Sequence, residues 1–228
     1  YTSAMAMKED LEQLMQSKYS AGFQQFPSNW KHMSSPWQDV ELVELQPSSA
    51  DFKQVADMFY LTCKKAEWRI VQIERVQNLP QWQLYLTHKR MIESRQRPRG
   101  ANEMQLFHGT DKISKFKINC NSFNRSFCGK NATAYGQGVY FARSASYSIC
   151  DTYSRPDEQG NKYMYLARVL AGEFCKGDSS MRMPPPQSSE SDLLLFDSTV
   201  DRLEQPSMHV IYHDAQAYPE YLITIRRA

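Results

Sequence analysis

The segment Leu106–Thr110 reads LFHGT and places a histidine at the end of an apolar run. The imidazole of His108 can donate or accept hydrogen bonds near neutral pH. Gly109 follows it and has no Cβ, so a ligand can approach the backbone closely there. A single histidine at a strand end is nevertheless more often structural than catalytic, and no neighbouring carboxylate completes a triad. The segment alone therefore identifies a candidate and no reaction.

A second cluster lies in the segment 131–142, which reads NATAYGQGVYFA. Two glycines bracket a turn that leads into a strand bearing Tyr140, and Ser148 and Tyr153 follow. Tyrosine rings and hydroxyls at this density can form flat walls and hydrogen-bond partners for a planar polar ring. Packing of the same tyrosines in a core and at its rim explains the pattern equally well.

Two common classes of nucleotide site are absent from the sequence. It contains neither GxGxxG after a predicted strand nor GxxxxGK[ST], so a nucleotide would have to be held in another way. The five cysteines are odd in number, scattered and free of CxxC spacing. They favour reduced thiols over a disulfide framework or a zinc site.

The composition describes one large globular domain of 228 residues, 41% of them hydrophobic. A net charge of +2 gives no general attraction to nucleic acid or to an anionic membrane. The sequence contains no apolar stretch long enough to span a membrane and no signal pattern at its start. We therefore expect an intracellular protein, cytoplasmic or nuclear, that does not bind membranes.

The first half of the chain predicts a scaffold of alternating strands and helices. Val40–Leu45 is predicted as a strand, and Ser48 and Ser49 can cap the helix after it. That helix has an apolar face of period 3.6 running from Phe52 to Cys63. Trp68–Gln77 predicts a strand, and Asn78 with Pro80 starts another helix.

The second half predicts short strands joined by connections of uneven length. The predicted strands are Met104–His108, Gly138–Ala142, Tyr163–Leu170, Met208–Tyr212 and Tyr221–Ile225. A Pro-rich surface loop is expected around Pro184–Pro186. Without regular βαβ alternation, the pattern indicates an α+β domain dominated by antiparallel pairing.

The remaining segments set the expected boundaries. Ala4–Tyr19 predicts an amphipathic helix, and Gly22–Trp37 an irregular stretch anchored by aromatic residues. We expect an N-terminal helical extension or linker at 1–27 and one domain at 28–228. The basic stretch Arg95–Gly100 could touch phosphates, although a solvated linker is favoured.

Taken together, LFHGT, FNRSFCGKNATAYGQGVYFA and the closing YPEYLITI resemble the catalytic domain of the poly(ADP-ribose) polymerase family. The similarity runs from about Trp30 to Ala228. More specifically, the sequence resembles the mono-ADP-ribosylating subgroup, including members whose longer chains carry macro domains. The resemblance implies an α+β fold of two packed antiparallel β-sheets around an NAD-binding cleft, flanked by helices.

The resemblance also implies roles for individual residues. His108 would bond a ribose hydroxyl of NAD+, while Gly109 and Ser148 would hold the nicotinamide carboxamide. Tyr140 and Tyr153 would flank the ring, where an aromatic face suits a cationic pyridinium. A donor loop from about Asn124 to Ala134 would cover the dinucleotide. The expected NAD+-binding residues are His108, Gly109, Thr110, Arg125, Tyr140, Ser148 and Tyr153, with Lys130 also able to reach the pyrophosphate.

The third family position, where polymerising members have glutamate, aligns with Met208. A thioether is a weak acceptor and cannot act as a general base at neutral pH. We therefore predict a catalytic set of His108, Tyr140 and Met208 that transfers one ADP-ribose. Glu204 is the alternative carboxylate if this alignment is displaced.

The resemblance implies a transferase acting on protein acceptors, with aspartate or glutamate favoured, self-modification possible, and neither a metal nor a direct DNA requirement. A catalytically inactive binding module and an NAD+ glycohydrolase are the rivals. At Ser122 relatives commonly have glycine; if the position needs a positive φ, serine costs about 1 kcal/mol and shifts the donor loop.

Overall fold

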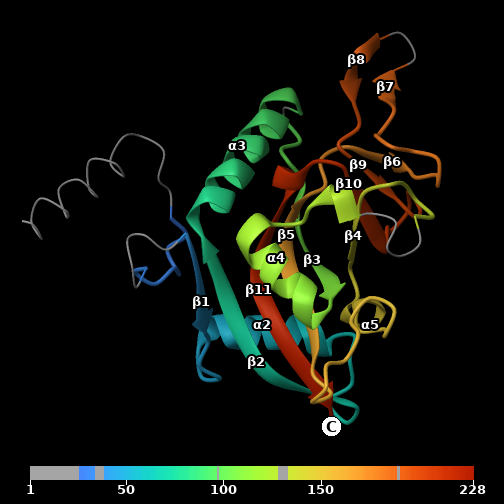
Figure 1. Cartoon of the computed structure of the whole chain (residues 1–228). Coiled ribbons are helices and arrows are strands. Elements are labelled where there is room, and N and C mark those ends of the chain that lie inside the picture. The colour runs from blue at the N-terminus through green and yellow to red at the C-terminus, as the bar shows by residue number, and fades with distance from the viewer. Residues whose placement is uncertain (1–25, 34–38, 97, 128–132, 189–190) are drawn as a thin grey trace, which may run out of the picture.

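The computed structural model describes residues 26–33, 39–96, 98–127, 133–188 and 191–228. The expected N-terminal helix Ala4–Tyr19 lies outside these residues, as does Lys130. In Figure 1 a broad twisted sheet runs through the molecule with helices against it. No helix in the described part of the chain is long and apolar enough to cross a membrane.

The helices are α2 (Ala50–Tyr60), α3 (Leu79–Arg95), α4 (Lys112–Asn121) and α5 (Ala145–Ser148), with 3-10 turns η1 (Arg125–Phe127) and η2 (Asp214–Gln216). The strands are β1 (Val40–Glu44), β2 (Trp68–Asn78), β3 (Glu103–Thr110), β4 (Val139–Ala142), β5 (Lys162–Leu170), β6 (Phe174–Lys176), β7 (Pro186–Ser188), β8 (Ser191–Leu195), β9 (Ser198–Val200), β10 (Met208–Ile211) and β11 (Ala217–Arg227). Every strand and helix predicted from the described residues is confirmed, with boundaries shifted by a few residues. Helix α4 was not predicted, because its lysines interrupt any apolar period.

Helix starts follow the capping residues. The Ser49 hydroxyl accepts a hydrogen bond from the Phe52 N–H and starts α2. The Asn78 side chain does the same for α3, with a proline in the first turn. Asp111 caps α4 by accepting from Ile113 and Ser114 directly after β3. The cap at Asp111 thus turns the chain away as soon as the His108 segment ends.

Nine strands form one hydrogen-bonded sheet in the order β1-β2-β11-β5-β3-β4-β10-β9-β6, and β7 with β8 forms a separate hairpin. All neighbours in the large sheet are antiparallel except β6 and β9. The α+β class with antiparallel pairing is therefore confirmed. The two expected sheets are joined into one, but only narrowly, because β3 and β4 pair solely through Phe107 and Ala142. We call this joint the seam.

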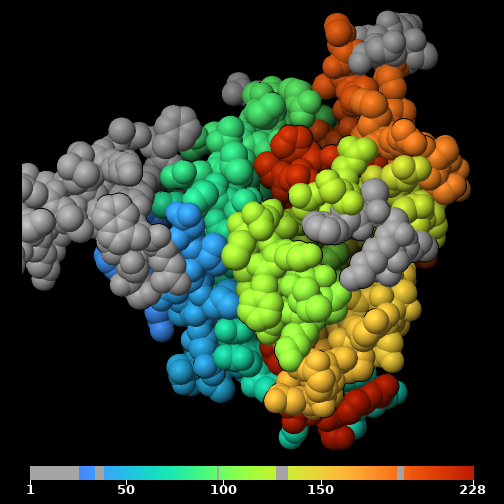
Figure 2. Space-filling model, in the orientation of Figure 1, coloured from blue at the N-terminus to red at the C-terminus, as the bar shows by residue number. Residues whose placement is uncertain are grey.

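Helices cover both faces of the sheet. One face carries α2 and α5 over an apolar cluster that includes Phe59, Ile73 and Leu166. The opposite face carries α4 over a cluster that includes Ile118, Phe123 and Tyr165. Figure 2 shows α4 and the segment after it, in yellow-green, at the centre of the visible surface. The second cluster also includes Phe141 of β4 and Ile211 of β10, so side chains pack across the seam on this face.

Two segments were predicted to be exposed loops or linkers. Pro186 lies in β7, whose hairpin with β8 projects from the body in Figure 1, so the Pro-rich stretch is only partly a loop. In the basic stretch Arg95–Gly100, Arg95 ends α3 and pairs with Asp197, and the exposed Arg99 pairs with Glu173 at 2.6 Å.

Candidate active site

His108 lies in β3 just beyond the seam. Its Nδ1 is 2.8 Å from the carbonyl oxygen of Tyr140 in β4. A carbonyl only accepts, so Nδ1 carries the proton and Nε2 of the neutral ring is an acceptor. Burial lowers the pKa of His108 below its usual 6.5, against the opposing effect of the Tyr140 carbonyl. The residue therefore offers a neutral acceptor nitrogen in a fixed tautomer.

Gly109 is required by close packing. A Cβ at this position would lie 2.2 Å from the Ser148 carbonyl oxygen and 2.9 Å from the Tyr153 Cβ. Contacts this short do not occur, so any side chain at 109 would push α5 away from β3. Glycine thereby brings Ser148 and Tyr153 against the end of the strand. Thr110 is buried, so its side chain offers little surface to a ligand.

Tyr153 is supported by a residue that the sequence reasoning did not select. The rings of Tyr147 and Tyr153 stack with centroids 4.9 Å apart, and their hydroxyl oxygens are 2.6 Å apart. Burial, together with the hydrogen bond to Tyr153, raises the pKa of Tyr147. The i, i+6 spacing of two tyrosines around a short helix was the only available signal. Tyr147 fixes the plane of the Tyr153 ring.

Tyr140 folds its hydroxyl back onto the turn before β4. The hydroxyl accepts from the Tyr135 N–H and donates to the Gly136 carbonyl, both at 2.8 Å. Burial raises the pKa of Tyr140 to about 12, so the phenol is neutral. Its hydroxyl is engaged, which leaves the ring as the part available to a ligand.

Met208 begins β10 opposite Ala142 of β4 and is buried. Its backbone N–H donates to Asp201, whose carboxylate also accepts from the N–H and hydroxyl of Ser207. These hydrogen bonds lower the pKa of Asp201 against the effect of burial. Glu204 is exposed in the preceding turn. Asp201 is thus the carboxylate that contacts Met208, and its hydrogen bonds fix the start of β10.

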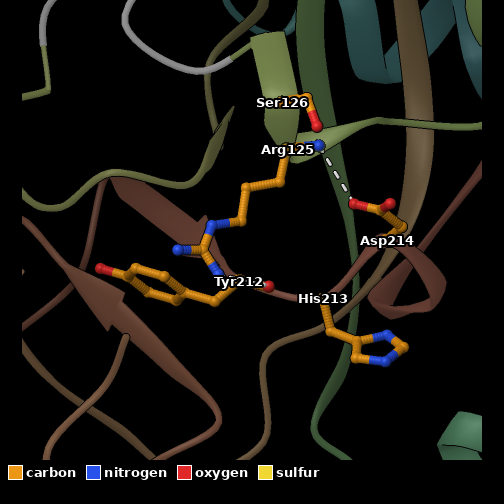
Figure 3. A pocket seen from close by; sticks show the side chains of 5 residues that line it. All are labelled: Arg125, Ser126, Tyr212, His213 and Asp214. Atoms are coloured by element: carbon orange, nitrogen blue, oxygen red, sulfur yellow. Dashed lines mark hydrogen bonds between the residues drawn. The ribbon is translucent and has the colours of Figure 1, made fainter. Parts of the chain in front are cut away.

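Arg125 lies in η1 and points toward β10 rather than to the end of β3. Its guanidinium donates to the carbonyls of Tyr212 and Arg182 and lies over the Tyr212 ring at 5.7 Å. Figure 3 shows the Arg125 side chain beside Tyr212 and the hydrogen bond from the Arg125 backbone N–H to Asp214, which is 3.0 Å long. These residues line an open hollow of about 440 Å³. A pyrophosphate role for Arg125 would have to replace these contacts.

Ser122 adopts the conformation that the sequence made critical. Its φ is +57°, as glycine would favour, and it ends α4. The buried hydroxyl donates to the Ala217 carbonyl at 3.1 Å, which offsets part of the backbone cost. The segment leading to the donor loop is therefore anchored, whereas residues 128–132 of that loop lie outside the described residues.

The structure brings most of the expected residues together. His108, Gly109, Tyr140, Ser148 and Tyr153 meet around the end of β3, and Met208 enters through the neighbouring strand. Arg125 is the expected residue that points elsewhere. Among the residues that the structure describes, no three histidine, cysteine, aspartate or glutamate side chains gather as they would around a metal ion.

Comparisons with known proteins indicate the family of the chain. The poly(ADP-ribose) polymerase catalytic domain family matches residues 49–194, a range that ends before Met208. The human protein mono-ADP-ribosyltransferase PARP14 is 44% identical over 201 residues, which are 88% of this chain and 11% of that protein. Mouse PARP10 is 43% identical over 189 residues, or 81% of this chain and 19% of its own length.

Human PARP12 is 37% identical over 202 residues, or 89% of this chain and 28% of its own length. Each of these relatives is named a protein mono-ADP-ribosyltransferase. The chain spans less than a third of the length of any of the three. By its fold, its site and these similarities, the chain belongs to the poly(ADP-ribose) polymerase catalytic domain family.

Proposed function

We propose that this chain is a protein mono-ADP-ribosyltransferase domain that moves one ADP-ribose from NAD+ to an acceptor side chain and releases nicotinamide. The observation that carries the proposal is the meeting of His108, Gly109 and Tyr140 at the seam, with a thioether at the third family position. The names of the relatives support it.

The described residues fit NAD+ as substrate. The acceptor nitrogen Nε2 of His108 suits a ribose hydroxyl, which donates. The buried Ser148 and the backbone of Gly109 suit a carboxamide, and the rings of Tyr140 and Tyr153 suit a flat cation. No Rossmann motif is needed, because His108, the Gly109 backbone and Ser148 supply the polar groups that would hold NAD+.

The reaction breaks the glycosidic bond between C1′ of the ribose and the pyridinium nitrogen. The electron pair of that bond leaves with nicotinamide, which departs neutral. An acceptor carboxylate oxygen forms the new bond to C1′, so the acceptor needs no base at neutral pH because it is already ionised. The protein contributes positioning and electrostatic stabilisation of an oxocarbenium-like transition state.

Transfer stops after one unit because a growing chain needs an activated hydroxyl. Met208 cannot accept a proton, and Asp201 is occupied by Ser207 and the Met208 N–H. The acceptors are expected to be proteins, self-modification included, on aspartate or glutamate. An intracellular setting, cytoplasmic or nuclear, and independence from DNA stay predictions of this proposal.

The test incubates the chain with labelled NAD+ and a generic protein acceptor, followed by denaturing gel and intact mass. One ADP-ribose increment that disappears in His108→Ala and Tyr140→Ala supports the proposal. Leu193→Ala, at a 95% exposed hairpin residue, is the control and should transfer normally.

Three outcomes contradict the proposal. Polymer from the unmodified chain overturns the role given to Met208, which Met208→Glu then checks. NAD+ binding by calorimetry without transfer indicates an inactive binding module. Free ADP-ribose with an unlabelled acceptor indicates a glycohydrolase.

A further inference from the structure

The turn Tyr135–Gly138 feeds the strand that carries Tyr140. Besides the two hydrogen bonds to the Tyr140 hydroxyl, the Gln137 N–H donates to the Met181 carbonyl at 2.8 Å. The position of the Tyr140 hydroxyl, and hence of its ring, is therefore coupled to the position of this turn.

Tyr212, directly after β10, holds the same turn from the opposite side. Its hydroxyl oxygen is 2.8 Å from Thr199 Oγ1, and Thr199 in turn donates to the Tyr135 carbonyl at 2.7 Å. Thr199 has a single hydroxyl hydrogen, which that carbonyl uses. Tyr212 is accordingly the donor to Thr199, with the Tyr135 carbonyl as a more distant second acceptor at 3.5 Å, and a chain of two hydroxyls runs from β10 to the turn.

Gly136 shows how tightly Tyr212 fits. A Cβ at Gly136 would lie 1.8 Å from the Tyr212 hydroxyl oxygen, and the glycine has φ +130°. The Tyr212 hydroxyl thus lies directly against the backbone of the turn. No other residue type could occupy 136 with Tyr212 in place.

Arg125 connects the same tyrosine to the start of the donor loop. Figure 3 shows its guanidinium beside the Tyr212 ring, and it also donates to the Tyr212 carbonyl at 3.4 Å. Tyr212 therefore contacts residues before and after the segment 128–132, which lies outside the described residues. Its ring contacts Arg125, and its hydroxyl lies against the turn at Gly136.

We propose that Tyr212 is a positioning residue for ADP-ribosyl transfer: through Thr199 and Gly136 it sets the turn that orients Tyr140. This inference rests on the proposed function for its kinetic consequence, and on the contacts above for its structural one. Tyr212 touches neither substrate nor acceptor in this account. Its loss should displace the Tyr140 ring and weaken NAD+ binding more than it slows the chemical step.

The kinetic test compares Tyr212→Phe with Thr199→Val and Thr199→Ser in the whole chain. Tyr212→Phe keeps the ring over which Arg125 lies and removes only the hydroxyl. It should raise KM for NAD+ about 5-fold or more while kcat changes by less than about 3-fold. Thr199→Val should match it, and Thr199→Ser, which keeps a hydroxyl, should behave as the unmodified chain.

Tyr218→Phe is the matched control. Its hydroxyl also makes two hydrogen bonds, to the Val76 carbonyl and from the Asn78 N–H, but in another part of the sheet. An equal KM increase in Tyr218→Phe would show a general loss of stability and would overturn the inference.

A double-mutant cycle tests whether both tyrosines act through one turn. In a Tyr140→Phe background, Tyr212→Phe should raise KM by less than half of its effect in the unmodified chain. Independent, fully multiplying effects would overturn the inference.

Amide hydrogen exchange tests the structural part without NAD+. Exchange at Tyr135 and Gln137 should accelerate about 5-fold or more in Tyr212→Phe and Thr199→Val, and not in Thr199→Ser or Tyr218→Phe. Unchanged exchange overturns the inference even if the chain is an active transferase. Accelerated exchange in a chain that neither binds nor uses NAD+ would uphold the positioning contact and reject only the proposed function.

Discussion

Two histidines on neighbouring parts of the sheet have different surroundings. His108 in β3 has one ring nitrogen bonded to the Tyr140 carbonyl. His209 in β10 is 1% exposed, and neither of its ring nitrogens has a hydrogen-bond partner. Its ring packs edge-on against Phe174 at 5.7 Å.

The two histidines differ in whether a hydrogen-bond partner fixes the tautomer of the ring. Burial lowers the pKa of both, and for His209 it lowers it to about 4, helped by Arg143 and opposed by Asp201. Only His108 has a backbone partner that fixes which nitrogen carries the proton. A defined tautomer at the seam can serve a ligand, whereas an enclosed ring without partners only costs free energy.

The largest expected difference is in activity. His108→Ala removes the acceptor nitrogen and the contact across the seam, and should lower kcat/KM for NAD+ about 100-fold or more. His209→Phe should change it less than about 3-fold. Steady-state kinetics of both variants measure this, and a similar loss in the two would remove the distinction.

The next effect is on stability as the pH falls. The unfolded chain protonates His209 near pH 6.5, but the folded chain does so only near pH 4. Protonation of His209 in the unfolded chain therefore leaves the free energy of unfolding almost unchanged above pH 6.5. As the pH decreases toward 4 it lowers the free energy of unfolding, by about 1 kcal/mol at pH 5.5. Burial also lowers the pKa of His88, which stacks on His213, to about 4, and this adds a loss of the same sign.

Urea unfolding at pH 7 and pH 5.5 checks this dependence. His209→Phe should lose less stability over that interval than the unmodified chain does. An equal loss would mean that His209 does not stay neutral in the fold.

At neutral pH, replacing His209 should be favourable. His209→Phe removes two buried nitrogens without partners and keeps a ring against Phe174, so the free energy of unfolding should rise by about 1 kcal/mol. His209→Asn keeps polar atoms at the position and should give no gain. Destabilisation by the phenylalanine would show that His209 has a partner in solution.

The smallest expected effect is the pH profile of the transfer itself. Because burial lowers the pKa of His108, the ring is mostly neutral from pH 6.5 to 8, and kcat/KM should vary less than about 2-fold there. A decrease in kcat/KM with a midpoint at pH 6.5 or above would show that the pKa of His108 is not lowered.

The sequence predicted the scaffold better than the support around the site. Capping at Ser49 and Asn78 is local chemistry, so α2 and α3 could be predicted from their own residues. The joining of the two sheets depends on one residue pair far apart in the chain, which no local pattern encodes. The fold class followed from the first kind of signal and from the family resemblance.

The same limit applies to the site. His108, Gly109 and Tyr140 stood out because motifs mark them, but Asp201 and Thr199 reach the site only through the pairing of β9 with β10. Arg125 was expected at the pyrophosphate from its place in the loop, and its contacts with Tyr212 could not be anticipated from spacing.

The position of His108 at the seam also gives it a structural role. One residue pair and one imidazole hydrogen bond connect β3 to β4, so His108 helps to hold together two halves of the sheet whose side chains also pack across the seam around Phe123. A nucleotide bound across the seam would contact both halves of the sheet at once. Binding of the nucleotide would then stabilise the whole domain as well as position the groups that react.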